Sequence, residues 1–159
     1  TLTHVTISGN EAAYGGGGIY IYGSNLILTN VTIRGNMASI LGGGMDCGVS
    51  DILELNNLTI ISNIAPDGAG IYFRHGNLIL QNTLISGNIA DNYGGGILAL
   101  GTGAQSGTIS HINTTIVSNS AGIAGGAIYS LHHNLIFTNT IIWDNGLESI
   151  VPYIMVRTA

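Results

Sequence analysis

The chain has 159 residues, of which 45% are hydrophobic and only 7% charged, and lysine is absent. Its three arginines against eight acidic residues give a formal net charge of −5, which excludes the basic face that nucleic-acid binding needs. The apolar runs are short and interrupted, whereas a membrane-spanning helix needs about 20 consecutive apolar residues. We therefore expect no nucleic-acid partner and no transmembrane segment in this chain.

A repeat of about 26 residues organises the whole sequence. The apolar residue after each glycine cluster recurs at spacings of 26, 26, 26, 31 and 26, and an Asn recurs at spacings of 26, 27, 25, 31 and 26. Two markers of different chemistry recur with nearly the same spacing, including at the one long interval, which indicates a solenoid of about six coils. The first marker comprises Ile19, Met45, Ile71, Ile97, Ile128 and Ile154, and the second comprises Asn10, Asn36, Asn63, Asn88, Asn119 and Asn145.

Each repeat predicts three short strands. In chain order these are a β-branched triplet, a strand that follows the glycines, and a leucine-rich strand. They alternate with period two between Gly, Asn, Ser and Thr, as strands do, and no run shows the longer 3.6-residue period of a helix. A leucine-rich horseshoe fits less well, because its leucine signature is missing. The strands are 5–7, 19–22 and 26–28, with copies at 31–33, 58–60 and 114–116, at 71–74 and 128–131, and at 53–55, 78–80 and 135–137.

The predicted fold is therefore all-β: one parallel β-helix domain over residues 1–159, with three parallel sheets. Parallel strands stack about 4.8 Å apart, so equivalent residues of successive coils lie over one another. His4 aligns with Asn30, and the strand expected at 150–156 stops part-way through a coil. We therefore expect a segment of a longer solenoid, cut within a coil at both ends.

Stacking also predicts the role of each recurrent residue. The Asn column is expected at a bend, in the left-handed conformation, with its amides hydrogen-bonded from coil to coil. Inward positions include Cys47, read as a small buried hydrophobe, and His111, which falls in the column of Leu55 and Leu80. Small residues suit tight corners, and glycine permits positive φ and close backbone approach; these are Ala12, Ala38, Ala65, Ala90 and Ala121, and the glycine clusters 15–18, 42–44, 94–96 and 125–126.

One copy of the repeat resembles a known family. Gly125-Gly126-Ala127-Ile128 followed by Phe137-Thr138-Asn139 is similar to the repeat of chlamydial polymorphic outer-membrane proteins, which pairs GGAI with a downstream FxxN. This copy has Phe-x-Asn, and other copies read GGGI or GAGI with Leu-x-x-Asn or Leu-x-Asn. More broadly, the sequence resembles bacterial right-handed parallel β-helix proteins. This resemblance implies a right-handed solenoid, and so does the usual right-handed crossover of parallel strands.

The outward face of the post-glycine strands is the candidate binding surface. Aromatic side chains on a flat sheet suit sugar rings or a partner protein, although a ladder of stacked aromatics can also simply stabilise the sheet. One outward column is Tyr20, Asp46, Tyr72, Leu98 and Tyr129, and the next is Tyr22, Gly48, Arg74, Leu100 and Leu131. The ligand-binding candidates are Tyr20, Tyr22, Asp46, Tyr72, Arg74 and Tyr129.

Catalytic and metal-binding patterns are weak. Enzymes of this architecture that hydrolyse polysaccharides need two carboxylates about 5–9.5 Å apart on one groove, and the column neighbours of Asp46 are tyrosines. Asp67 and Asp91 are too few for Ca²⁺, which takes 6–8 oxygens. His75, His132 and His133 are expected on exposed turns near an insertion at Gly101–Gly107. We expect no catalytic residue, no metal site and no cofactor.

The sequence thus favours an extracellular or bacterial cell-surface scaffold, adhesin-like and non-catalytic, that binds a polysaccharide or a host or cell-surface protein. Such repeats also occur in polysaccharide-active enzymes, because fold does not fix function. The alternative is therefore a fragment of a polysaccharide lyase or glycoside hydrolase, with its catalytic residues in loops or outside this segment.

Overall fold

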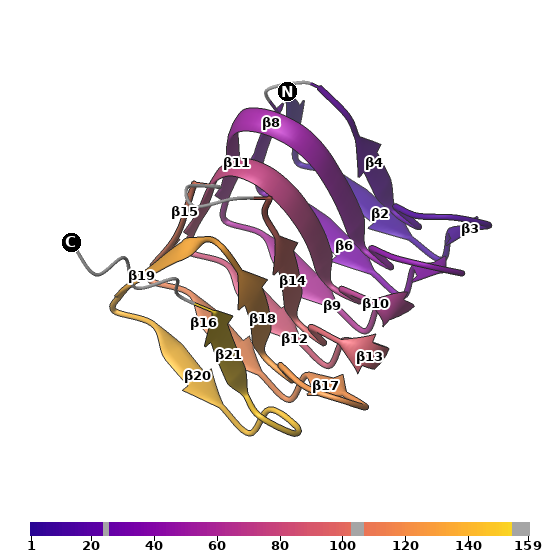
Figure 1. Cartoon of the computed structure of the whole chain (residues 1–159). Helices are drawn as coiled ribbons and strands as arrows, with labels where there is room; N and C mark the ends of the chain where they lie inside the picture. The colour runs from indigo at the N-terminus through magenta and orange to yellow at the C-terminus, as the bar shows by residue number, and fades with distance from the viewer. Residues whose placement is uncertain (24–25, 103–106, 154–159) are drawn as a thin grey trace.

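The computed structural model describes residues 1–23, 26–102 and 107–153, and every regular element in these residues is a β-strand. All strand pairs are parallel, and each coil lies on the next at the same register. Figure 1 shows the coils stacked from the indigo N-terminal end to the yellow C-terminal end. The prediction of a parallel β-helix with three parallel sheets is confirmed.

The six-stranded sheet is formed by the β-branched triplets. The central isoleucines Ile33, Ile60, Ile85 and Ile116 pair in one column and are fully buried. Five coil-to-coil steps separate its first and last strands, because the sheet stacks one strand from each coil. Its strands are β2 (Thr6–Ser8), β6 (Thr32–Arg34), β9 (Thr59–Ile61), β12 (Leu84–Ser86), β16 (Thr115–Val117) and β20 (Ile141–Trp143).

The ten-stranded sheet contains both the post-glycine strands and the leucine-rich strands, which the sequence placed in separate sheets. Two coils run through both segments as one long strand, and in the second of these Gly76, with a φ of 103°, lies at a register shift. The ten strands are β1 (Leu2–Thr3), β4 (Ile19–Ile21), β5 (Leu26–Thr29), β8 (Met45–Asn56), β11 (Ile71–Gln81), β14 (Ile97–Leu100), β15 (Thr108–Ile112), β18 (Ile128–Leu131), β19 (Asn134–Thr138) and β21 (Ile150–Tyr153).

The five-stranded sheet was read from the sequence only as a corner of alanines. Ala65 pairs with Ala90, and Ala90 with Ala121, so the predicted Ala column is in register and buried. The strands around it are short, because a turn with a positive-φ glycine follows each of them. They are β3 (Glu11–Ala12), β7 (Met37–Ala38), β10 (Ile64–Asp67), β13 (Ile89–Tyr93) and β17 (Ser120–Ala121).

The last coil is shorter than the repeat predicted. The sequence placed Ile154 over Ile128, but the residue that pairs with Ile128 is Ile150, and Ile154 lies outside the described residues. The spacing from Ile128 to its partner in the last coil is therefore four residues shorter than the predicted 26. The rest of that inward column, from Ile19 through Met45, Ile71 and Ile97 to Ile128, has the predicted register.

The interior contains one thiol and one imidazole among apolar side chains. Cys47 is fully buried, and burial raises the pKa of its thiol far above the ordinary value, which makes it an inert hydrophobe as predicted. His111 is also fully buried, pairs in register with Leu80, and stacks on Phe137 with ring centroids 4.9 Å apart. Among the described residues, neither ring nitrogen of His111 has a hydrogen-bond partner, and burial lowers its pKa to about 4.

The predicted Asn column forms a continuous ladder inside the solenoid. At each step Oδ1 of one Asn accepts both the backbone N–H and the Nδ2 of the Asn one coil earlier; the Nδ2···Oδ1 distances are 2.9 Å from Asn63 to Asn88 and 2.9 Å from Asn88 to Asn119. The second Nδ2 hydrogen is donated to a carbonyl of the preceding coil, as from Asn63 to Ile33. Each inner amide is therefore fully satisfied.

A second Asn ladder lies on the outer surface, and its hydrogen bonds run in the opposite direction along the stack. Here the Asn of the later coil donates to the earlier one, for example Asn57 Nδ2 to Asn30 Oδ1 at 3.1 Å. These outer residues adopt the left-handed conformation, with φ values of 56° at both positions. In the inner ladder the positive φ falls one residue earlier, at Gly35 and Ser62, so the left-handed conformation predicted for the inner Asn column is wrong.

The two ladders should differ strongly in their contribution to stability. Asn63→Ala leaves buried partners in two coils unpaired, at about 1–3 kcal/mol for each orphaned group, and we expect the free energy of unfolding to fall by about 3 kcal/mol. The matched control is Asn57→Gly, which removes an exposed amide and still permits positive φ, with an expected loss below about 1 kcal/mol. Urea denaturation measures both, and equal losses would contradict a dominant inner ladder.

His111 should make the fold sensitive to acid. Its folded-state pKa of about 4 lies below the ordinary 6.5, so the unfolded chain takes up the proton first as the pH falls. The contribution of neutral His111 to the free energy of unfolding is therefore fully present above pH 6.5 and is lost as the pH falls from 6.5 to 4. At 1.36 kcal/mol per pKa unit, this loss amounts to about 3 kcal/mol. We expect His111→Leu, which matches Leu80 beside it, to remove this slope from the unfolding free energy; an unchanged slope would contradict the assignment.

Candidate functional site

The outward face of the ten-stranded sheet is partly covered by five stacked arms, defined as residues 11–16, 37–42, 64–68, 89–94 and 120–125. Figure 1 shows the arm strands β3, β10, β13 and β17 along one side of the stack. Each arm ends in a positive-φ glycine that lies on the outward residue four positions later: a Cβ built on Gly42 would come 2.8 Å from that of Asp46, and one on Gly94 would come 2.6 Å from that of Leu98. Only glycine lets the chain approach the sheet this closely.

The residue before each of these glycines faces the sheet in a column of its own. Asp67 pairs with Leu41 on one side and with Tyr93 on the other, and Tyr93 pairs with Ala124. The Tyr93 N–H donates to Asp67 Oδ1 at 3.3 Å. The arms thus bring a carboxylate and a phenol to the edge of the sheet face.

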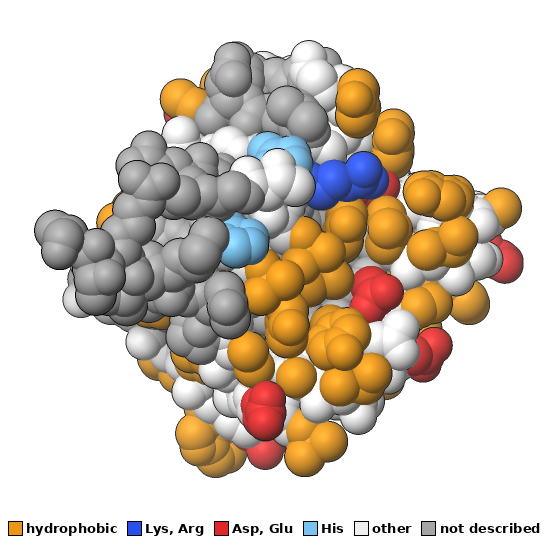
Figure 2. Space-filling model, in the orientation of Figure 1, with side chains coloured by type: hydrophobic (Ala, Val, Ile, Leu, Met, Phe, Trp, Pro, Cys, Tyr) orange, Lys and Arg blue, Asp and Glu red, His pale blue; other side chains and the backbone are white. Residues whose placement is uncertain are grey.

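A groove of about 300 Å³ lies between the arms and the sheet. Figure 2 shows the apolar side chains gathered over this face, with acidic side chains beside them. Two of its rings, Tyr93 and Tyr129, meet with centroids 4.9 Å apart and planes inclined at 54°. The groove is lined by Leu41, Asp67 and Tyr93 from the arms and by Tyr72, Leu98, Leu100, Tyr129 and Leu131 from the sheet.

Tyr72 lies at the floor of this groove and is only 9% exposed. Burial raises the pKa of its hydroxyl, the Arg74 charge opposes that rise, and the negative charges of Asp46 and Asp67 add to it. The electrostatic effect of Asp67 on Tyr72 agrees with their shared place in the groove lining. This region therefore combines aromatic surface with negative charge.

Asp46, expected on an open binding face, is fully buried. Arg74 Nη2 lies 3.4 Å from Asp46 Oδ1, and the Arg74 guanidinium carbon lies 5.1 Å from the centroid of the Tyr72 ring. A Cβ built on Gly15 would come 2.7 Å from Asp46 Oδ2, so the first arm covers the carboxylate. Burial raises the pKa of Asp46, and the charge and hydrogen bonding of Arg74 oppose the rise.

The six ligand-binding candidates therefore separate into groups. Tyr72 and Tyr129 line the groove, and Arg74 with Asp46 forms an ion pair beside Tyr72. Tyr20 and Tyr22 are 57% and 65% exposed and do not line it. A Cβ built on Gly48 would come 2.6 Å from the Tyr22 ring, so this ring lies against the neighbouring coil.

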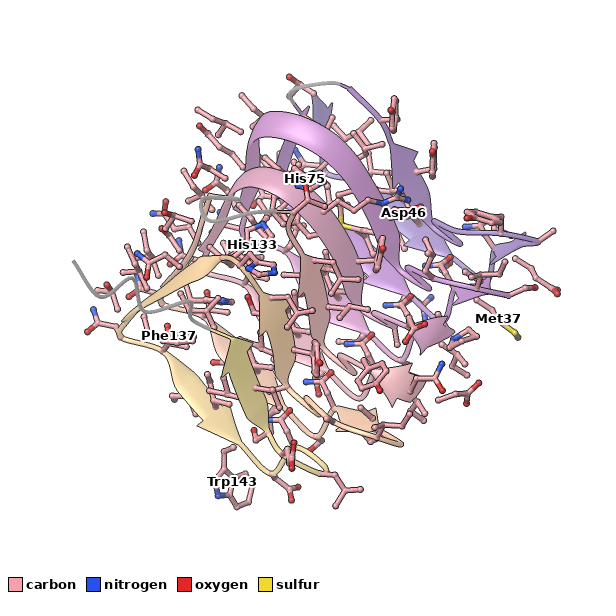
Figure 3. All side chains as sticks on the ribbon, in the orientation of Figure 1. Met37, Asp46, His75, His133, Phe137 and Trp143 are labelled. Atoms are coloured by element: carbon pink, nitrogen blue, oxygen red, sulfur yellow. The ribbon has the colours of Figure 1, made fainter. Side chains whose placement is uncertain are left out.

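The histidines near the insertion do not all lie on exposed turns. His133 was expected on an exposed turn, yet it is 3% exposed, with its ring centroid 5.4 Å from that of Phe73; Figure 3 shows it beside the sheet, near His75. Burial lowers its pKa. Of the insertion at Gly101–Gly107, residues 103–106 lie outside the described part. Within the described residues, no three His, Cys, Asp or Glu side chains gather where they could hold a metal ion.

Sequence reasoning missed the three arm residues of the groove, Leu41, Asp67 and Tyr93. A signal for them was present: each directly precedes a glycine of the repeat, and the column Gly15, Leu41, Asp67, Tyr93 and Ala124 has spacings of 26, 26, 26 and 31. The sequence pattern predicts only corners at these positions, and a corner residue gives no sign that it faces a sheet.

The comparisons with known proteins agree with this architecture. The chlamydial polymorphic membrane protein repeat matches residues 4–22 and 82–100. Each match runs from an outer-ladder position, through one arm and its glycines, to the outward strand of the groove face. The GGAI copy at 125–128 lies outside both matches.

No curated protein and no solved structure matches the chain. Among the residues described, none belongs to a helix long and apolar enough to cross a membrane. Two coils of this parallel β-helix are thus similar to the chlamydial polymorphic membrane protein repeat.

Proposed function

We propose that this chain is part of a bacterial surface scaffold, adhesin-like and non-catalytic, which binds a glycan or protein partner in the groove between the arms and the ten-stranded sheet. The observation that carries the proposal is the lining of this groove, where Tyr72, Tyr93 and Tyr129 come from three successive coils. The two matches to a membrane-protein repeat support a place at the outer membrane or cell surface.

The groove is suited to binding because its walls are held in place before any ligand arrives. Tyr72 and Tyr129 stand on strands within the ten-stranded sheet, and Tyr93 belongs to a strand of the five-stranded sheet. Side chains on regular strands lose little further freedom on binding, which favours affinity. A volume of about 300 Å³ is at the small end of ligand sites, which suits one sugar ring or one side chain.

The carboxylates favour binding over hydrolysis. Glycosidases use two carboxyl groups that face the same substrate, and Asp67 is the acidic residue of the described groove lining. Asp46 is closed off from solvent and paired with Arg74. A polysaccharide lyase or hydrolase would have to draw its catalytic groups from elsewhere.

Retention of polysaccharides on the immobilised chain tests this function. We expect at least one member of a panel of neutral and acidic polysaccharides to bind, and Tyr129→Ala to weaken that binding about tenfold, since an aromatic contact contributes about 0.5–1.5 kcal/mol beyond its buried area. Tyr20→Ala is the matched control, because Tyr20 stands in the same outward column but outside the groove; it should bind like the wild type.

Reducing ends and unsaturated products are measured in the same samples, and none should appear. Equal retention by the wild type and Tyr129→Ala would contradict the groove as the site. Product formation that disappears in Asp67→Asn, which removes the carboxylate of the groove lining, would instead favour the enzyme.

A further inference from the structure

The groove has one chemical feature that a plain apolar pocket lacks, which is an aromatic lining around a negative charge. Tyr72, Tyr93 and Tyr129 supply three rings, and Asp67 supplies a half-buried carboxylate. The electron-rich face of a tyrosine ring attracts a cation within about 6 Å of its centroid. In this fold Tyr72 already has a cation beside it, since the Arg74 guanidinium lies 5.1 Å from the ring centroid.

We propose that the groove is a binding site for a quaternary ammonium ion of the choline type. The proposal rests on the proposed function, because it names the ligand class of the same groove. Asp67 and the rings of Tyr93 and Tyr129 are the groups that hold the cation, with Leu98 and Leu100 against its methyl groups.

Charge complementarity favours a cation over an anion. Arg74 and Asp46 compensate each other, and no cation pairs with Asp67 within the described part of the chain, so the groove retains one net negative charge. The chain as a whole carries a formal net charge of −5, which attracts cationic ligands and repels anionic ones.

Hydrogen-bond capacity favours a quaternary over a primary ammonium ion. A primary ammonium carries three N–H donors that each require an acceptor when they leave water. One oxygen of Asp67 already accepts the Tyr93 N–H, and the leucines offer no acceptor. The phenolic oxygens of the three tyrosines in the lining can accept, but they are neutral and bind an ammonium N–H less strongly than a carboxylate does. A trimethylammonium group has no donor, and its methyl surface matches the leucines and rings of the lining.

Three small molecules that share a hydroxyethyl group separate the possible causes of binding. The probes are choline, its neutral carbon isostere 3,3-dimethylbutan-1-ol, and ethanolamine, which has a primary ammonium in place of the trimethylammonium. Each is titrated into the full chain at constant ionic strength, and the NMR shifts of the tyrosine rings report binding. We expect choline to bind about tenfold more tightly than either of the others.

Paired variants place the ion in the groove. Asp67→Asn should weaken choline binding about fivefold without changing the binding of the neutral isostere, whereas Asp91→Asn, which removes the same charge from an exposed position outside the lining, should leave both unchanged. Tyr93→Leu should weaken choline binding about fivefold, and Tyr93→Phe, which keeps the ring, should stay within about twofold. Thermal unfolding checks that each variant is folded.

Choline binding no tighter than that of its isostere, equal effects of Asp67→Asn and Asp91→Asn, or the absence of choline binding would overturn the proposal. The polysaccharide experiment distinguishes this failure from a failure of the proposed function. If polysaccharide retention still depends on Tyr129 while choline does not bind, the groove is a partner site for a ligand without a quaternary ammonium group. If neither binds, both proposals are wrong.

Discussion

The stacking of one amide on the next is the interaction on which the rest of this fold depends. An inner Asn makes its ladder bonds only when the next Asn lies one strand spacing away, and the bonds persist where the repeat lengthens to 31 residues, with 2.9 Å from Asn88 Nδ2 to Asn119 Oδ1. An insertion must therefore occur at a position where it does not shift the Asn column out of register. In the sequence, the five additional residues fall between β14 and β15, whereas the ladder residue Asn88 lies between β12 and β13.

Because the inward residues and the Asn ladder hold the coils in register, the residue type at outward positions can vary. Inward columns repeat the same residue types, such as isoleucine in the six-stranded sheet and alanine in the five-stranded sheet. The column before the arm glycines changes instead from Gly15 to Leu41, Asp67, Tyr93 and Ala124. Each arm keeps its backbone because the glycine after it sets the turn. The chemistry of the groove is therefore decided by side chains that the solenoid itself does not need.

The period was enough to predict the strands of the six-stranded and ten-stranded sheets, the Asn ladder and the buried His111, because residues at equivalent positions of stacked coils lie in contact. It did not predict the strands of the five-stranded sheet. Nor could it predict what covers the outside of the ten-stranded sheet. Asp46 has an outward place in the alternation, yet the arm residue Gly15 and the Arg74 side chain bury it, and both effects are tertiary. The continuous strands β8 and β11 and the four-residue shift at Ile150 likewise do not follow from the repeat.

Asp46 and Asp67 show how the same architecture gives two carboxylates opposite roles. Asp46 belongs to the sheet, where burial requires a compensating charge, and Arg74 provides it. Asp67 belongs to an arm and remains half-buried, and within the described part of the chain one of its oxygens accepts the Tyr93 backbone N–H. Its charge is therefore not neutralised within the described fold, and it lies among aromatic rings that favour the same sign of ligand. In the proposed site, this arrangement would favour a cation before any contact with the rest of a partner is made.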